Sequence, residues 1–214
     1  MHFELSYGDI GILFFLTLGP LKAILPFARA TRGTEPAFRR AVAWRAVAIA
    51  TAIVLGVALL GPFILPNWHV SPPAIAITCG IILFYQALRI IMQTPAGPRS
   101  ANPETSPSRP SPAIAVFPVA IPAIVTAPGI AALAAVSVLY RHDLAHEAVV
   151  VALLIAVMAL NLLTLWNTDR ILGHGFAGVL PVVGWVLAVL QASLAVQIVI
   201  YSLRVLEVLN WPAS

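Results

Sequence analysis

The sequence predicts an all-α integral membrane protein with six transmembrane helices, arranged as two inverted three-helix repeats. The first observation is composition: 60% of the 214 residues are hydrophobic and 9% are charged, whereas a soluble domain has about 25% charged residues. The second is a set of apolar stretches, each long enough to cross a bilayer. The third is a proline-broken segment in the first stretch that recurs in the fourth.

A helix needs about 20 mainly apolar residues to cross the hydrocarbon core of a membrane. The second and third stretches are divided by the polar and proline-rich segment from Gly61-Pro62 to Pro72-Pro73, which predicts a turn. The six predicted spans are residues 10–28, 42–65, 74–92, 113–138, 149–166 and 179–203.

The basic residues predict the orientation of the spans. Nine of the twelve Lys and Arg residues lie in the loops after the first, third and fifth spans or in the span ends that adjoin these loops, and cytoplasmic loops are enriched in these residues. These loops are therefore predicted to be cytoplasmic, and both termini to lie on the outer side. Glu4 and Asp9 precede the first span without any Lys or Arg, unlike a cleaved signal peptide. We expect the first span to be retained.

Residues 93–112 are rich in Pro, Ser and Thr, which predicts a cytoplasmic linker rather than a helix. The linker separates residues 1–92, the first repeat, from residues 113–214, the second. Three spans in each half would place the second repeat upside down relative to the first, as in many transporters. A six-helix bundle without internal symmetry is the alternative.

Prolines break the first and fourth spans in a matched way. Pro20 and Pro26 have five residues between them, and Pro122 and Pro128 repeat this spacing. Because proline lacks an N–H group and clashes with the carbonyl four residues earlier, such carbonyls need other partners. In hydrocarbon they find these only within a bundle or beside a water-filled cavity.

Lys22 is the only formal charge well inside a predicted span, and no Asp or Glu lies inside any span. The freed carbonyls in this segment are predicted to be those of Leu16 and Lys22. An intramembrane charge is a functional hypothesis by default, and a substrate carboxylate or the freed carbonyls could stabilise it. Alternatively, the long side chain could snorkel to the headgroups. The sequence leaves both alternatives open.

Two broken segments at corresponding positions indicate a solute site between the repeats. Helix N-termini at such breaks present unpaired N–H groups to anions, and Gln191 is a polar side chain in the middle of the last span. The candidate substrate-binding residues are Gly19, Pro20, Lys22, Pro26, Pro122, Thr126, Pro128, Gly129 and Gln191. Other polar residues in the spans are predicted to hydrogen-bond between helices: Thr78, Tyr85, Gln86, Asn161, Thr164, Ser193 and Gln197.

The remaining motifs argue against several classes of function. No catalytic motif is present, so we expect no enzyme, and the basic charge beside apolar runs favours a membrane over nucleic acid. Cys79 is the single cysteine, which excludes a thiol-pair redox carrier. His142-Asp143 and His146-Glu147 have a spacing that metal sites use, but a solvated outer loop is favoured. We expect neither a bound metal nor a cofactor.

Several segments of the chain together resemble a known family. They are the run from Gly19-Pro20-Leu21 to Thr31, Pro36, Arg39-Arg40, Gly80 to Phe84, Ala87-Leu88-Arg89, Ala127-Pro128-Gly129-Ile130 and Ala195-Val196-Gln197. These segments are similar to the MarC family of bacterial inner-membrane proteins. The resemblance implies a multi-pass inner-membrane protein of the LysE superfamily, some of whose members transport neutral amino acids. The family typically has Asn-Pro-x-Gly in the first span, where this chain has Gly19 and Lys22 at the Asn and Gly positions.

Two functional hypotheses follow. The first is a secondary transporter or exporter of small solutes such as amino acids, which works by alternating access, with or without a coupling ion. The alternative is a non-transporting membrane component that stabilises or assembles other proteins. The bilayer is a partner in both, and the sequence leaves a homo-oligomer open.

The predicted orientation can be tested by cysteine labelling in intact cells. In a background without Cys79, Ser71→Cys is expected to react with an impermeant external reagent, because Ser71 lies in a predicted outer loop. Ser100→Cys is expected to react only after the cells are permeabilised. Labelling of Ser100→Cys from outside would contradict the orientation.

Overall fold

The computed structural model describes residues 6–67, 71–92, 112–139, 144–173, 180–206 and 208. The first half contains α1 (Tyr7–Leu18), η1 (Pro20–Lys22), α2 (Ile24–Ala30), α3 (Pro36–Asn67) and α4 (Pro72–Met92). The second half contains η2 (Pro112–Ala115), η3 (Val116–Ile124), α5 (Ala127–Leu139), α6 (Leu144–Trp166), α7 (Thr168–Gly173) and α8 (Leu180–Val205).

The predicted all-α membrane fold is confirmed. The described residues include five helical segments that are long and apolar enough to cross a membrane: Tyr7–Ala30, Pro36–Gly61, Pro72–Met92, His146–Trp166 and Val182–Val205. A shorter apolar helix, Ala127–Ser137, belongs to the fourth predicted span. That span is assembled from η2, η3 and α5 rather than from one continuous helix.

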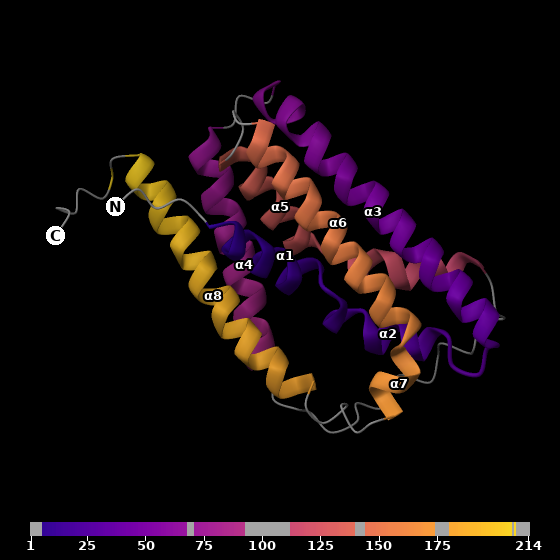
Figure 1. The fold of residues 1–214 in the computed structure, drawn as a ribbon. Helices are drawn as coiled ribbons and strands as arrows, with labels where there is room; N and C mark the ends of the chain where they lie inside the picture. Colours follow the sequence, from indigo (N-terminus) through magenta and orange to yellow (C-terminus); the bar gives the residue numbers. More distant parts are fainter. Residues whose placement is uncertain are drawn as a thin grey trace.

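The broken first span lies at the centre of the molecule. Figure 1 shows α1 between α8 and α4 on one side and α3 and α6 on the other. In its most apolar window 61% of the residues are buried, compared with 22% to 33% in the other four spans. Irregular backbone is tolerated at membrane depth only where protein or a cavity surrounds it. The central position therefore permits the break.

Corresponding helices of the two halves run antiparallel. Gln191 of α8 donates its Nε2 to the carbonyl of Leu83 in α4, at 3.1 Å. Further along α8, a side chain at Gly80 would lie 2.9 Å from the Ala195 carbonyl oxygen and 2.6 Å from Val199. Later residues of α8 therefore contact earlier residues of α4, so the two helices are antiparallel. The glycine allows the two helix backbones to approach closely.

The same relation holds for α3 and α6. Arg39, near the start of α3, pairs with Asp169, which follows the end of α6. Each half thus consists of a broken span followed by two long helices, with α7 added in the second half. The superposition of the halves about a two-fold axis stays a prediction.

Three local expectations were wrong. Helix α3 continues through Gly61-Pro62 and ends at Asn67, because a membrane helix can accommodate proline where neighbouring groups satisfy the freed carbonyl. His146-Glu147 lies in the first turn of α6 rather than in a loop. Residues after Trp166 form the short helix α7 instead of a loop.

The first break is made by Gly19-Pro20. Helix α1 ends at Leu18, and Gly19 is extended (φ −76°, ψ 168°), the conformation that a residue before proline prefers. Pro20 then begins η1. Pro26 lies in the first turn of α2, where a backbone N–H has no partner within the helix in any case. Pro26 therefore fits its helix without a further break.

Side chains of the second half pair the carbonyls at the end of α1. The Thr126 hydroxyl donates to the Thr17 carbonyl at 3.0 Å, and Asn161 Nδ2 donates to the Leu18 carbonyl at 2.8 Å. These carbonyls receive the cross-helix partners that we had predicted for Leu16 and Lys22. The extended Gly19 ends the helix and leaves the last carbonyls of α1 without partners in their own helix.

The second break follows the same backbone rule. Phe117 (φ −131°, ψ 126°) and Ile121 (φ −126°, ψ 124°) are extended within η3, and each precedes a proline. A wide turn then closes between the Val125 N–H and the Ala120 carbonyl, at 2.9 Å. Thr126 Oγ1 accepts from the Gly129 N–H at 3.1 Å and so caps α5.

The polar side chains in the spans divide into two groups. Asn161 and Gln191 bond to other helices, as predicted. Thr78, Thr164 and Ser193 instead donate to carbonyls of their own helices, which a short hydroxyl side chain reaches without any neighbour. Among these residues the amides of Asn161 and Gln191 reach an adjacent helix, whereas Gln86 Oε1 is buried without a hydrogen-bond partner among the described residues.

Replacement of Thr126 tests the link between the two halves. Thr126→Val keeps the shape but removes the bond to Thr17 and the cap of α5, so we expect a loss of about 1–3 kcal/mol in the free energy of unfolding. Thr126→Ser keeps the hydroxyl and should therefore retain most of this free energy of unfolding. Chemical denaturation of the purified protein in detergent measures the change.

The matched control is Thr164→Val, because the Thr164 hydroxyl bonds only to the Leu160 carbonyl of its own helix among the interactions described. Its effect is expected to stay within about 0.5 kcal/mol. Equal losses in Thr126→Val and Thr164→Val would contradict the bracing role of Thr126.

Candidate functional site

A cavity of about 270 Å³ lies where the first break faces α4 and α8. Its walls come from the last turns of α1, from η1 and the start of α2, and from the facing ends of α4 and α8. The lining residues are Phe15, Leu16, Gly19, Leu21, Lys22, Leu25, Ile90, Gly184, Leu187, Ala188 and Gln191. Three of these, Gly19, Lys22 and Gln191, are sequence-predicted site residues.

Two polar side chains face an otherwise apolar lining. The Lys22 Nζ atom is buried and has no hydrogen-bond partner among the described residues. Gln191 is 1% exposed, and its bond to the Leu83 carbonyl fixes the orientation of its amide. The cavity thus combines one unpaired cationic group with apolar walls. This chemistry suits an anionic group attached to a small apolar body.

Gly19 shapes the wall of the cavity. A Cβ atom added to its extended backbone would lie 1.9 Å from the Phe15 carbonyl oxygen, so a larger residue would force the chain to move. Pro20 fixes the backbone immediately after it, which places Lys22 in η1 at the edge of the cavity.

The other predicted residues lie away from the cavity lining. Thr126 and Gly129 brace the opposite side of the first break, and a Cβ atom at Gly129 would lie 2.3 Å from Leu18 Cδ2. A side chain at Gly129 would therefore clash with Leu18. The described cavity lies between the first break, α4 and α8. A site between the broken first and fourth spans stays a prediction.

The predicted prolines act through the backbone. Pro20 begins η1, and Pro26 and Pro128 lie in the first turns of α2 and α5. Pro122 follows the extended Ile121 inside η3. None of the four is among the residues that line the cavity. Their contribution is to create the two breaks and the helix ends beside them.

Sequence reasoning missed most of the lining. Ile90, Gly184, Leu187 and Ala188 come from α4 and α8, and nothing in an apolar helix distinguishes a residue that faces a cavity from one that faces lipid. Thr126 did carry a recognisable signal, because a threonine shortly before a proline is typical of a helix N-cap with proline in the first turn. The cross-helix bond of Thr126 had no such signal.

The described residues contain no group of three or more His, Cys, Asp or Glu side chains that could hold a metal ion. His146 lies beside Tyr7, with ring centroids 5.3 Å apart. Its proposed companions, His142 and Asp143, lie outside the described residues.

Comparison with known proteins agrees with this architecture. The model of the MarC family of integral membrane proteins matches residues 6–206. The inner membrane protein YhgN of Escherichia coli strain K12 is 31% identical over 145 residues, which cover 68% of this chain and 70% of YhgN. The YhgN proteins of Escherichia coli O157:H7 and Shigella flexneri match to the same extent. No solved structure matches the chain significantly. The chain is therefore a multi-pass inner-membrane protein that belongs to the MarC family.

Proposed function

We propose that this protein is a secondary transporter or exporter of small solutes such as amino acids, and that the cavity beside the first break binds the solute. The observation that carries the proposal is the buried, unpaired Lys22 Nζ at an apolar cavity. A buried ammonium is costly without a partner. A carboxylate that enters with the solute offsets this cost and leaves with it.

The dimensions and lining of the cavity limit the solute. About 270 Å³ is close to the lower end of the range for small-molecule sites, about 300–1,000 Å³, which favours a small molecule. Leu16, Leu21, Leu25 and Leu187 provide apolar walls, so the part of the solute beyond its carboxylate is expected to be apolar. Small neutral amino acids and short organic acids meet both conditions.

The backbone also supports movement between two states. The cavity is bounded on one side by a span that is broken at Gly19 and on the other by α8. Broken spans at a repeat interface are a recurrent feature of transporters that work by alternating access. The antiparallel relation of α4 to α8 and of α3 to α6 fits the inverted repeat that such a mechanism uses.

The alternative function is a non-transporting component that stabilises or assembles other proteins. It expects the Lys22 ammonium to extend toward the headgroups, whereas the Nζ atom here is buried. It also gives no reason for a cavity at the break. Both observations favour the transporter.

Lys22→Met tests the proposal, because methionine keeps a long unbranched side chain and removes the charge. Purified protein is reconstituted into proteoliposomes, and uptake is screened over neutral amino acids and short carboxylic acids. For the solute that the natural protein transports, we expect uptake by Lys22→Met to fall at least about tenfold, since a charge-assisted hydrogen bond is lost.

The control is Arg45→Met, which removes an exposed charge from α3 outside the cavity and should leave uptake unchanged. Gln191→Leu should also reduce uptake, because it removes a polar group from the cavity lining and breaks the hydrogen bond to the Leu83 carbonyl. Normal uptake by a folded Lys22→Met variant would refute the role of Lys22. Absence of uptake across the whole screen by the natural protein would favour the non-transporting component.

A further inference from the structure

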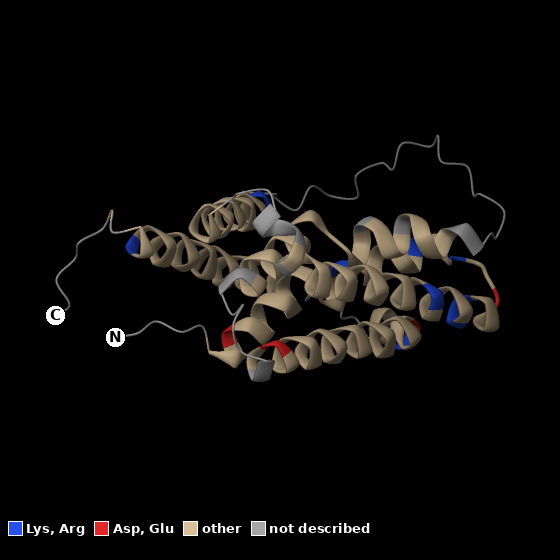
Figure 2. Ribbon diagram, turned by 90° about the horizontal axis from the view of Figure 1, so that it is seen from above, with Lys and Arg blue, Asp and Glu red and all other residues tan. Residues whose placement is uncertain are grey.

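A second hollow lies at the C-terminal end of α2 and shares Leu25 with the lining of the first cavity. It has a volume of about 380 Å³ and forms where α2 ends, α3 begins and α7 packs beside them. Figure 2 shows basic residues gathered at the end of the molecule where α3 begins. The lining residues are Leu25, Ala28, Arg29, Thr31, Arg32, Gly33, Arg39, Thr168, Asp169 and Leu172.

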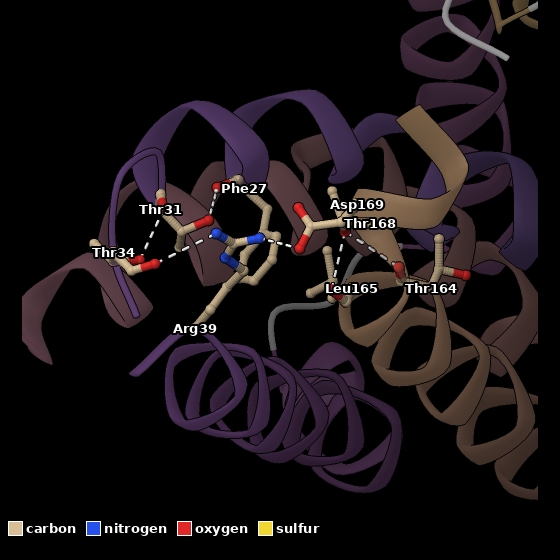
Figure 3. Close-up of polar contacts among 8 residues, drawn as sticks. All are labelled: Phe27, Thr31, Thr34, Arg39, Thr164, Leu165, Thr168 and Asp169. Atoms are coloured by element: carbon tan, nitrogen blue, oxygen red, sulfur yellow. Dashed lines mark hydrogen bonds and ion pairs between the residues drawn. The ribbon is translucent and has the colours of Figure 1, made fainter. Parts of the chain in front are cut away.

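The hollow carries an excess of positive charge. Arg29, Arg32 and Arg39 border it, and Asp169 is the only acidic side chain in its lining. Arg39 pairs with Asp169, and its second terminal nitrogen donates to the Thr34 carbonyl at 3.4 Å (Figure 3). The Arg39 Nε atom is buried without a hydrogen-bond partner among the described residues. The lining therefore contains three guanidinium groups and one carboxylate.

The hydroxyl groups of the lining do not reduce this excess. Thr31 donates to the Phe27 carbonyl at 2.8 Å, and Thr168 donates to the Leu165 carbonyl at 2.9 Å (Figure 3). Thr31 therefore stabilises the end of α2, and Thr168, at the start of α7, stabilises the end of α6. The arginine donors remain available for an acceptor that is not part of these contacts.

The backbone between α2 and α3 brings the arginines together. Gly33 has a positive φ of 77°, a left-handed conformation that glycine adopts without strain. The turn at Gly33 allows Arg29 and Arg32, from the end of α2, to border the same hollow as Arg39 from α3. The arrangement is thus built by the local sequence and by the docking of α7.

We propose that this hollow binds a phosphate group, supplied either by the headgroup of an anionic membrane lipid or by free phosphate. Guanidinium groups match phosphate oxygens in charge and in planar geometry. Basic pockets between transmembrane helices are suited to anionic headgroups, and Leu25, Ala28 and Leu172 give an apolar wall beside the charges. The inference concerns a different cavity from the proposed solute site and does not depend on transport.

The test measures lipid binding to the full-length protein in detergent by native mass spectrometry. Phosphatidylglycerol is titrated against the natural protein and against the double variant Arg29→Gln, Arg32→Gln. We expect the affinity for phosphatidylglycerol to fall at least about tenfold in the double variant, the effect of losing charge-assisted hydrogen bonds. Phosphatidylcholine, which has no net charge, should bind more weakly than phosphatidylglycerol to the natural protein.

Two further variants separate a built site from general charge attraction. Arg40→Gln removes an exposed arginine of α3 that does not line the hollow, and should change the affinity less than about twofold. Asp169→Asn removes the carboxylate that competes for Arg39, and should raise the affinity. Equal losses in Arg40→Gln and the double variant would overturn the proposal, as would unchanged or weaker binding in Asp169→Asn.

Competition by inorganic phosphate distinguishes the two sources. Displacement of phosphatidylglycerol by millimolar inorganic phosphate supports a site that accepts either source. If inorganic phosphate does not displace the lipid and the double variant loses affinity for it, the result supports the lipid headgroup. Lys22→Met should leave this binding unchanged, so failure of the transport proposal and failure of this one are separable. Equal affinity for phosphatidylglycerol and for diacylglycerol, which has no phosphate group, would refute the phosphate site.

Discussion

The hydrogen bonds to the Thr17 and Leu18 carbonyls are the constraint on which the rest of the structure depends. Helix α1 ends in the middle of a span, and carbonyl groups left unpaired there would cost several kcal/mol each in hydrocarbon. Thr126 and Asn161 of the second half supply the missing donors. The broken span must therefore lie inside the bundle, where both partners can reach it. This explains why the most interrupted of the long apolar segments is also the most buried.

The two breaks have different tasks despite their matched prolines. The second break packs tightly against the first through Thr126 and Gly129, where no space remains for a further side chain. The first break faces the opposite way, and its wall at Gly19 and Lys22 borders the cavity. The second break thus stabilises the first, whereas the first forms part of the cavity wall. The free energy gained at the second break allows the wall to remain irregular and to carry an unpaired ammonium group.

The same short helix separates two charged hollows. Leu25 of α2 lines both the cavity that contains Lys22 and the hollow bordered by Arg29, Arg32 and Arg39. Because Leu25 borders both, a shift of α2 would alter the volumes of the cavity and of the hollow together. The first hollow is mostly apolar and holds one cation, whereas the second is rich in guanidinium groups. Their ligands are accordingly expected to differ: a small carboxylate in one and a phosphate group in the other.

The sequence by itself determined the membrane class, the approximate spans and the break at Gly19-Pro20, because hydrophobic length and proline geometry are local properties of the chain. Pro26 and Pro128 were expected to break their spans but lie in the first turns of α2 and α5, and the second break lies at Phe117-Pro118 and Ile121-Pro122. The sequence also singled out Gly19, Lys22 and Gln191, since a glycine before proline, a charge and an amide are conspicuous in an apolar run. Only the tertiary structure decided which side of the first break is open. Ile90, Leu187 and Ala188 differ from lipid-facing residues in no local property, and their place in the cavity wall arises from the way α4 and α8 pack beside the first break. The partners of Thr17 and Leu18 lie more than one hundred residues away in the chain, so no local pattern could have identified them.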